Sequence, residues 1–126
     1  MYRDLLKTKY TIHGRSKEEG FDCYGLVIET LRRNNLFLPD VFYTSEKEYG
    51  MVYNKIVLSD YVERIESIER NCLICLFVYG EPNHVGMCIG EGLFIHATRN
   101  KGVVIEPISR YKSRIQGVFK VKNHII

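Results

Sequence analysis

The C-terminal half of the chain is a succession of short β-rich runs, and this pattern constrains the fold more than any other feature. The runs read CLICLFVY, VGMCIG, LFIHAT, GVVIEPI and GVFKVK, and turn-forming Gly, Pro and Asn residues separate them. Short apolar runs punctuated in this way are typical of antiparallel strands. We therefore expect an antiparallel sheet of about five strands over residues 72–122.

The hydrophobic pattern ahead of these runs has a helical period. Val27, Ile28 and Leu31 repeat at helical spacing within a segment that extends from about residue 23 to residue 35. Residues 45–70 are charged, and their stretch SDYVERIESIER fits a helix and an alternating strand equally well. A helix followed by a sheet predicts an α+β domain.

Length and composition indicate one globular domain over residues 1–126. The chain has 45% hydrophobic residues, enough for a single core. Its 18 Lys and Arg residues are interleaved with 15 acids, so we expect no nucleic-acid partner. The sequence contains neither a signal-peptide pattern nor an apolar window long enough for a membrane span. We therefore expect the protein to be made in the cytoplasm. If it acts outside the cytoplasm, another component must deliver it.

The four cysteines are expected to be thiols, since a chain of this size with this core needs no disulfide framework. Cys72 and Cys75 have C-x-x-C spacing, but residues three apart on a strand point to opposite faces, and a second ligand pair is missing. Core packing is the better interpretation for both, and also for Cys88. The sequence predicts no metal site and no cofactor.

Cys23 occupies a different setting, directly after Asp22 and at the predicted start of the helix. Asp22 is a good N-cap. The unsatisfied N–H groups and partial positive charge of a helix start stabilise a thiolate, so we expect the pKa of Cys23 to be lowered and its thiol to face a cleft. The same N–H groups suit an oxyanion. A lone Asp-Cys pair would nevertheless favour a structural cysteine.

Two histidines favour a nucleophilic role for Cys23 over a structural one. His84 opens one predicted strand and His96 lies in the next, across the expected three-residue loop 90–92. This loop length places Gly86 opposite His96, which makes His84 a diagonal neighbour of His96 on the same face. The two imidazoles are then within reach of each other. One histidine can serve as a base and the other as its orienting partner.

At these residues the sequence resembles the NlpC-type cell-wall peptidases, a papain-like family. Its Asp-Cys-x-Gly-Leu-Val motif matches residues 22–27, and its second motif matches HVGMCIGEGLFIHA at residues 84–97. The stretches HGRSKEEGFDCYGLV, LPDVFY and GVVIEPISRYKSRIQGVFKVK look most like the branch encoded in phage tail-assembly regions. The resemblance implies a helix that carries the nucleophile and packs on the sheet.

The resemblance also implies an activity. It is that of an endopeptidase that cuts the peptidoglycan stem peptide, typically between D-glutamate and a diamino acid, through a cysteine acyl-enzyme. Cys23 matches the nucleophile, His84 the catalytic histidine and His96 the polar third member. The implied partners are the stem peptide and phage tail proteins, and the implied location is the bacterial cell wall, as part of a virion tail.

Four further residues are expected to bind substrate, and the sequence departs from the family pattern near some of them. These residues are Tyr10, Gly14, Asp22 and Tyr24. Tyr24 stands where the family often has serine, and Tyr10 falls one position off the usual register. The Gly-Asp pair that usually opens the strand before the catalytic histidine is replaced around residues 71–73.

Three other functions remain open. A permuted thiol acyltransferase shares the fold and residue types, but its histidine precedes its cysteine, opposite to the order here. A catalytically inactive tail-structural or wall-binding module is possible because a fold does not guarantee activity. An antibacterial effector with the same wall chemistry would differ only in its delivery and partners.

Overall fold

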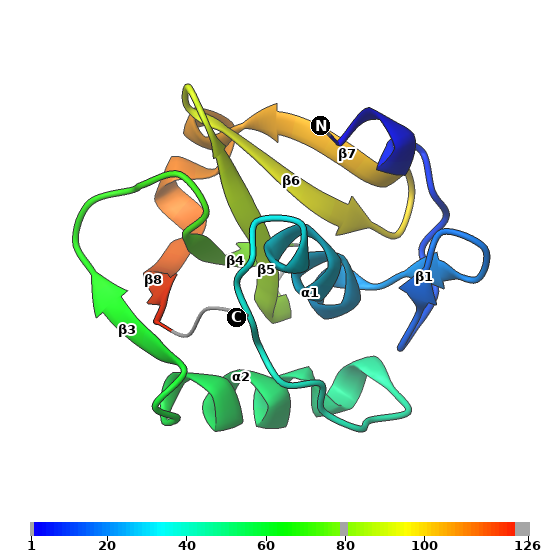
Figure 1. The fold of residues 1–126 in the computed structure, drawn as a ribbon, viewed down its shortest axis with the longest axis horizontal. Helices are drawn as coiled ribbons and strands as arrows, with labels where there is room; N and C mark the ends of the chain where they lie inside the picture. The colour runs from blue at the N-terminus through cyan, green and yellow to red at the C-terminus, as the bar shows by residue number, and fades with distance from the viewer. Residues whose placement is uncertain (1, 79–80, 123–126) are drawn as a thin grey trace.

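A six-stranded antiparallel sheet forms the centre of the computed structural model, which describes residues 2–78 and 81–122 (Figure 1). Its strands lie in the order β3-β8-β4-β5-β6-β7. Their bounds are β3 Val62–Ile65, β4 Leu73–Val78, β5 Glu81–Gly90, β6 Leu93–Thr98, β7 Gly102–Pro107 and β8 Ile115–Val121.

All five predicted runs contain a strand, which confirms the α+β fold class. The last residue of the first run, 79, lies outside the described residues. The sixth strand, β3, comes from the segment whose pattern fitted a helix and a strand equally, and it pairs with β8 at the edge of the sheet. β5 begins at Glu81, so His84 lies inside this strand rather than at its start.

Helix α1, Cys23–Arg32, packs against β5 and β6 and begins where the sequence predicts (Figure 1). The Asp22 side chain caps it by accepting a hydrogen bond from the Gly25 N–H at 2.8 Å. The helix ends three residues earlier than expected. The chain turns there through Asn34 and Asn35, and Asn35 takes a positive φ of 60°, a conformation that asparagine tolerates.

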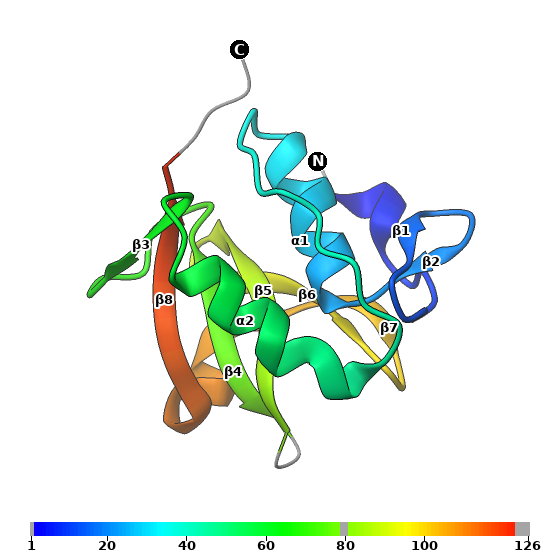
Figure 2. The same ribbon diagram turned by 90° about the horizontal axis from the view of Figure 1, so that it is seen from below.

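A second helix, α2 Tyr49–Val57, follows the short 3₁₀ turn η2 Glu46–Glu48. Figure 2 shows α2 crossing the sheet beside α1, in front of β4 and β5. The remaining elements are the 3₁₀ turns η1 Arg3–Leu5 and η3 Ile108–Arg114 and the two-stranded β1 Arg15–Ser16 and β2 Gly20–Phe21. Among the described residues, no helix has the length and apolar character needed to span a membrane.

The sheet buries apolar side chains on both faces. One cluster lies between the helices and the sheet, and a smaller one lies on the opposite face. Cys75 belongs to the first cluster and Cys72 and Cys88 to the second, so the C-x-x-C pair does point to opposite faces. The predicted packing role of these three cysteines is therefore confirmed, and all four cysteines are free, buried thiols.

Candidate functional site

Cys23 is the first residue of α1, and its thiol lies against β5. The backbone N–H groups of Val85 and Tyr24 donate hydrogen bonds to it. Val85 directly follows His84 in β5, so the helix start and the histidine-bearing strand adjoin at this point. The Asp22 side chain accepts from the Gly25 N–H and the Asp22 carbonyl from the Leu26 N–H, so the Cys23 N–H is the donor at the start of α1 that could bind an oxyanion beside the thiol.

The structure does not support the expected lowering of the pKa of Cys23. Cys23 is only 2% exposed, and burial, followed by the charge of the adjoining Asp22 carboxylate, raises the pKa of its thiol to about 12. The two backbone hydrogen bonds oppose this shift without reversing it. Desolvation therefore outweighs the helix-start effect, and the resting group is a neutral thiol.

The two histidines meet as the sequence predicts. His84 Nε2 and His96 Nδ1 are 2.8 Å apart. The register that brings them together arises differently from expected, because the loop has only two residues, Glu91 and Gly92, and a bulge separates Cys88 from Gly90. The bulge adds one unpaired residue to β5, which compensates for the loop being one residue shorter than expected. Met87 therefore still pairs with Ile95.

Glu106 of β7 extends this pair into a relay that sequence reasoning missed. Its Oε1 lies 2.7 Å from His96 Nε2 and also accepts a hydrogen bond from the Tyr111 hydroxyl at 2.8 Å. The Arg110 guanidinium donates to Oε2 at 2.6 Å. Burial alone would raise the pKa of Glu106, but the bonds from Tyr111, His96 and Arg110 lower it, so this carboxyl group is ionised.

An ionised Glu106 fixes the protons of both histidines. A carboxylate only accepts, so His96 donates from Nε2 and its Nδ1 becomes an acceptor. His84 must then donate from Nε2, which leaves its Nδ1 with a lone pair for a proton. Burial, together with the proximity of His96, lowers the pKa of His84 to about 3. The resting His84 is therefore a neutral imidazole in the tautomer of a base.

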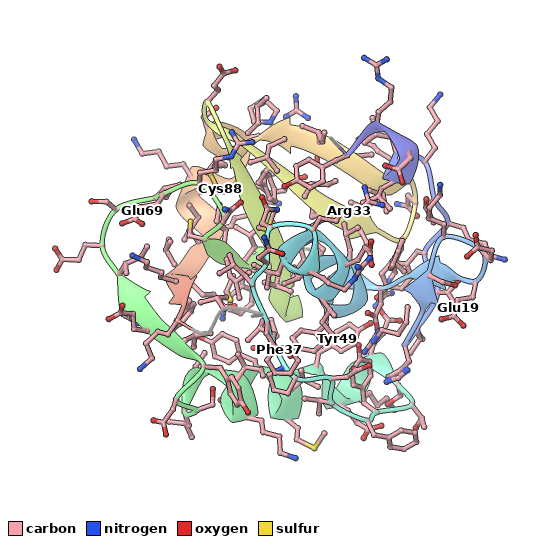
Figure 3. The ribbon with its side chains drawn as sticks, in the orientation of Figure 1. Glu19, Arg33, Phe37, Tyr49, Glu69 and Cys88 are labelled. Carbon is pink, nitrogen blue, oxygen red and sulfur yellow. The ribbon has the colours of Figure 1, made fainter. Side chains whose placement is uncertain are left out.

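A tyrosine–aspartate cluster, composed of Asp22, Tyr10, Tyr43 and Tyr49, lies beside the thiol. The Tyr43 hydroxyl donates to Asp22 Oδ2 at 2.5 Å, and Tyr49 contacts the same oxygen at 3.3 Å. The Arg15 guanidinium lies 3.0 Å from the other carboxylate oxygen. Tyr49 comes from α2, and Figure 3 shows it between α2 and α1. The cluster therefore ties α2 to the start of α1.

Two of the four expected substrate-binding residues are buried in contacts within the protein. Asp22 is completely buried, and its oxygens are occupied by protein donors, so it has no free face for a ligand. Gly14 is buried at a close approach of backbone segments. A Cβ atom there would collide with the carbonyl of Gly20, and a Cβ on Gly25 would collide with the carbonyl of Gly14.

Tyr10 and Tyr24 lie near the thiol, and their contact with substrate stays a prediction. The Tyr10 hydroxyl is 2.6 Å from that of Tyr49, and burial, followed by the proximity of Cys23, raises the pKa of Tyr10. Tyr24 is mostly buried and donates to the carbonyl of Pro39 at 2.6 Å.

An apolar pocket opens beside Cys23. α2 forms one wall with its inward face, and β4, β5 and β8 form the other. Its empty space, with the open solvent at its mouth included, is about 470 Å³. In residues 2–78 and 81–122, no group of three or more His, Cys, Asp or Glu residues is arranged to hold a metal ion.

These features define a class of α+β proteins in which a helix-start cysteine adjoins a strand-borne histidine relay. The chain belongs to the NlpC/P60 family, whose sequence model matches residues 7–119. The predicted family and fold are thereby confirmed.

Relatives agree with this assignment. The chain is 28% identical over 109 residues to the Escherichia coli (strain K12) protein named murein DD-endopeptidase MepS/murein LD-carboxypeptidase. The match covers 86% of this chain and 52% of that protein, so the chain spans about half the length of the curated relatives it matches.

Solved structures show the same fold. NlpC2 from Trichomonas vaginalis matches with a TM-score of 0.66 at 23% identity, over 92% of this chain and 42% of that one. The NlpC/p60 domain of the peptidoglycan hydrolase SagA matches with a TM-score of 0.60 at 18% identity, over 97% and 92% of the two chains.

Proposed function

We propose that the protein is a cysteine endopeptidase that cleaves a stem-peptide amide bond of peptidoglycan. The observation that carries this proposal is the Glu106–His96–His84 relay on strands that adjoin the helix-start Cys23. Family membership supports it, as does the name of the Escherichia coli relative, a murein endopeptidase and carboxypeptidase. The bond we assign is that between D-glutamate and the diamino acid, because the sequence motifs resemble peptidases with this preference.

The neutral resting pair dictates how the reaction starts. Because burial raises the pKa of Cys23 and lowers that of His84, the reaction starts from the neutral thiol and the neutral imidazole. His84 Nδ1 takes the thiol proton as the Cys23 sulfur attacks the scissile carbonyl. The Cys23 N–H at the start of α1 stabilises the charge that develops on the carbonyl oxygen. The relay to Glu106 stabilises the imidazolium as it forms.

The remaining steps release the amine and then hydrolyse the thioester. The amide C–N bond breaks, and the leaving amine takes the proton from His84, which leaves a thioester on Cys23. Water then attacks the thioester while His84 takes a proton from it, and the carboxylic acid and the free thiol are released. His96 orients His84 throughout and does not itself exchange a proton with the substrate.

We assign delivery to a phage or prophage tail, since the sequence motifs look most like that branch of the family. An antibacterial effector would perform the same chemistry after a different route of delivery. A catalytically inactive wall-binding module is the second candidate function. The burial of Cys23 and its raised pKa favour it, because a neutral, covered thiol is a poor nucleophile.

Hydrolysis of defined stem tetrapeptides separates these functions. The intact protein should release two peptides whose masses sum to the substrate plus one water, and Cys23→Ala should release none. Cys88→Ala is the matched control, because this thiol is equally buried but lies on the opposite face of the sheet. Peptide binding without any hydrolysis would support the inactive module.

A further inference from the structure

The pocket beside Cys23 has an unusual lining for a site that handles a charged peptide. Its α2 wall consists of Tyr49, Val52, Tyr53, Ile56 and Val57, a spacing that puts all five side chains on one helix face. None of the residues that line the pocket carries a charged side chain.

The opposite wall is apolar apart from the amide of Asn83. It includes Leu73, Val85 and Phe119, all of which are buried in the main core cluster. Arg64 is a cation near this wall, and its guanidinium lies 5.0 Å from the centre of the Phe119 ring and hydrogen-bonds to the Tyr53 side chain, outside the pocket lining itself. A charged group placed in the pocket would therefore lose its hydration without gaining a direct ionic partner.

The pocket also lies directly beside the proposed nucleophile, Cys23. Cys23 and Tyr24 line one part of it, so a group that fills the pocket must be attached close to the carbon that the sulfur attacks. We propose that this pocket is a subsite for an uncharged apolar side chain or alkyl group of the substrate. The proposal rests on the proposed role of Cys23 as the nucleophile. It implies that charged side chains, such as those of D-glutamate and a diamino acid, lie outside the pocket.

Alkylation of Cys23 by N-substituted iodoacetamides tests the subsite without requiring peptide hydrolysis. In this reaction a sulfur–carbon bond forms, a carbon–iodine bond breaks, iodide leaves and the thiol proton passes to solvent. The probes are the unsubstituted amide and its N-butyl, N-benzyl, N-(3-aminopropyl) and N-(2-carboxyethyl) derivatives. Rates at Cys23 are measured by peptide mass mapping and divided by the rates with glutathione.

Each buried methylene group is worth about fourfold in binding, so the N-butyl and N-benzyl probes should react at least tenfold faster than the unsubstituted amide. The two charged probes should show no such gain. Ile56→Phe and, independently, Val57→Phe should fill the pocket and remove the N-butyl advantage while the unsubstituted amide still reacts. Leu58→Phe is the control, because Leu58 is 85% exposed and does not line the pocket.

Three results would overturn the proposal. They are equal rates for apolar and charged probes, an N-butyl advantage that survives both filling variants, and no modification of Cys23 by any probe. Peptide hydrolysis is measured separately. An N-butyl preference in a protein that cleaves no stem peptide would therefore support the subsite and contradict the endopeptidase.

Discussion

Replacement of Glu106 by glutamine should weaken both the fold and the reaction, because this carboxylate ends the histidine relay. It accepts hydrogen bonds from His96 and Tyr111 on one oxygen and from Arg110 on the other. Glutamine keeps the length and one acceptor but loses the charge. Arg110 is more than half exposed and can regain water, so its ion pair contributes little to stability.

The bonds from His96 and Tyr111 carry most of the effect on stability. His96 is 1% exposed and cannot turn to water. If each bond falls from a charge-assisted to a neutral hydrogen bond, the loss is roughly 1 kcal/mol apiece, or about 2 kcal/mol in the free energy of unfolding. The substitution also removes the negative charge that stabilises the imidazolium of His84 during the reaction. We expect kcat/KM to fall by about tenfold to a hundredfold.

Urea denaturation and stem-peptide hydrolysis at a temperature where every variant is folded measure the two effects. Glu69→Gln is the matched control. Glu69 is half exposed and only approaches Lys120 at 3.9 Å, so its replacement should leave both quantities unchanged. Wild-type kcat/KM in folded Glu106→Gln would refute the relay, whatever happens to stability.

Three further predictions concern the site. In a stem-peptide assay, His84→Ala should lose turnover almost as completely as Cys23→Ala. His96→Asn should retain measurable turnover, and His96→Ala should retain less. An inactive but folded His96→Asn together with an active His84→Ala would reverse the roles assigned to the two histidines. Because the folded protein holds the pKa of His84 at about 3, below its ordinary 6.5, the unfolded chain binds the extra proton first. The His84 contribution to the free energy of unfolding should thus fall by up to about 1.4 kcal/mol per pH unit as the pH drops from 6.5 towards 3. Urea titrations of His84→Gln should show a shallower slope, and the remainder comes from His96 and from Glu106, whose pKa values are also lowered. Treatment with a chelator should leave activity unchanged or raise it, and loss restored by zinc would indicate a metallohydrolase.

The parts of the site that local sequence determines are those that the sequence predicts. Asp22 caps α1 because an N-cap needs only the next three residues. The meeting of His84 and His96 follows from their places in one hairpin, even though the loop contains two residues and a bulge instead of three residues. In both cases the contact is between residues close in sequence or joined by one turn.

The parts that depend on distant packing could not be predicted in the same way. The pKa of Cys23 is set by burial, which involves α2, a helix from a segment without a decisive pattern. Glu106 reaches His96 only because β7 pairs with β6 in the observed register. An acidic residue inside the apolar run GVVIEPI was the one available signal, since a buried acid in a strand requires partners.

Direct observation of an acyl-enzyme tests the central claim of a nucleophilic Cys23 most directly. The protein is mixed with a stem tetrapeptide, quenched in acid within the first turnovers, and analysed by intact and peptide mass spectrometry. We predict a transient mass increase equal to the acyl fragment, located on Cys23. The adduct should be missing in Cys23→Ala. In folded His96→Ala it should be more abundant where thioester hydrolysis becomes the slower step. Peptide turnover by Cys23→Ala, which can form no such adduct, would contradict the account. An adduct located on any residue other than Cys23 would contradict it as well.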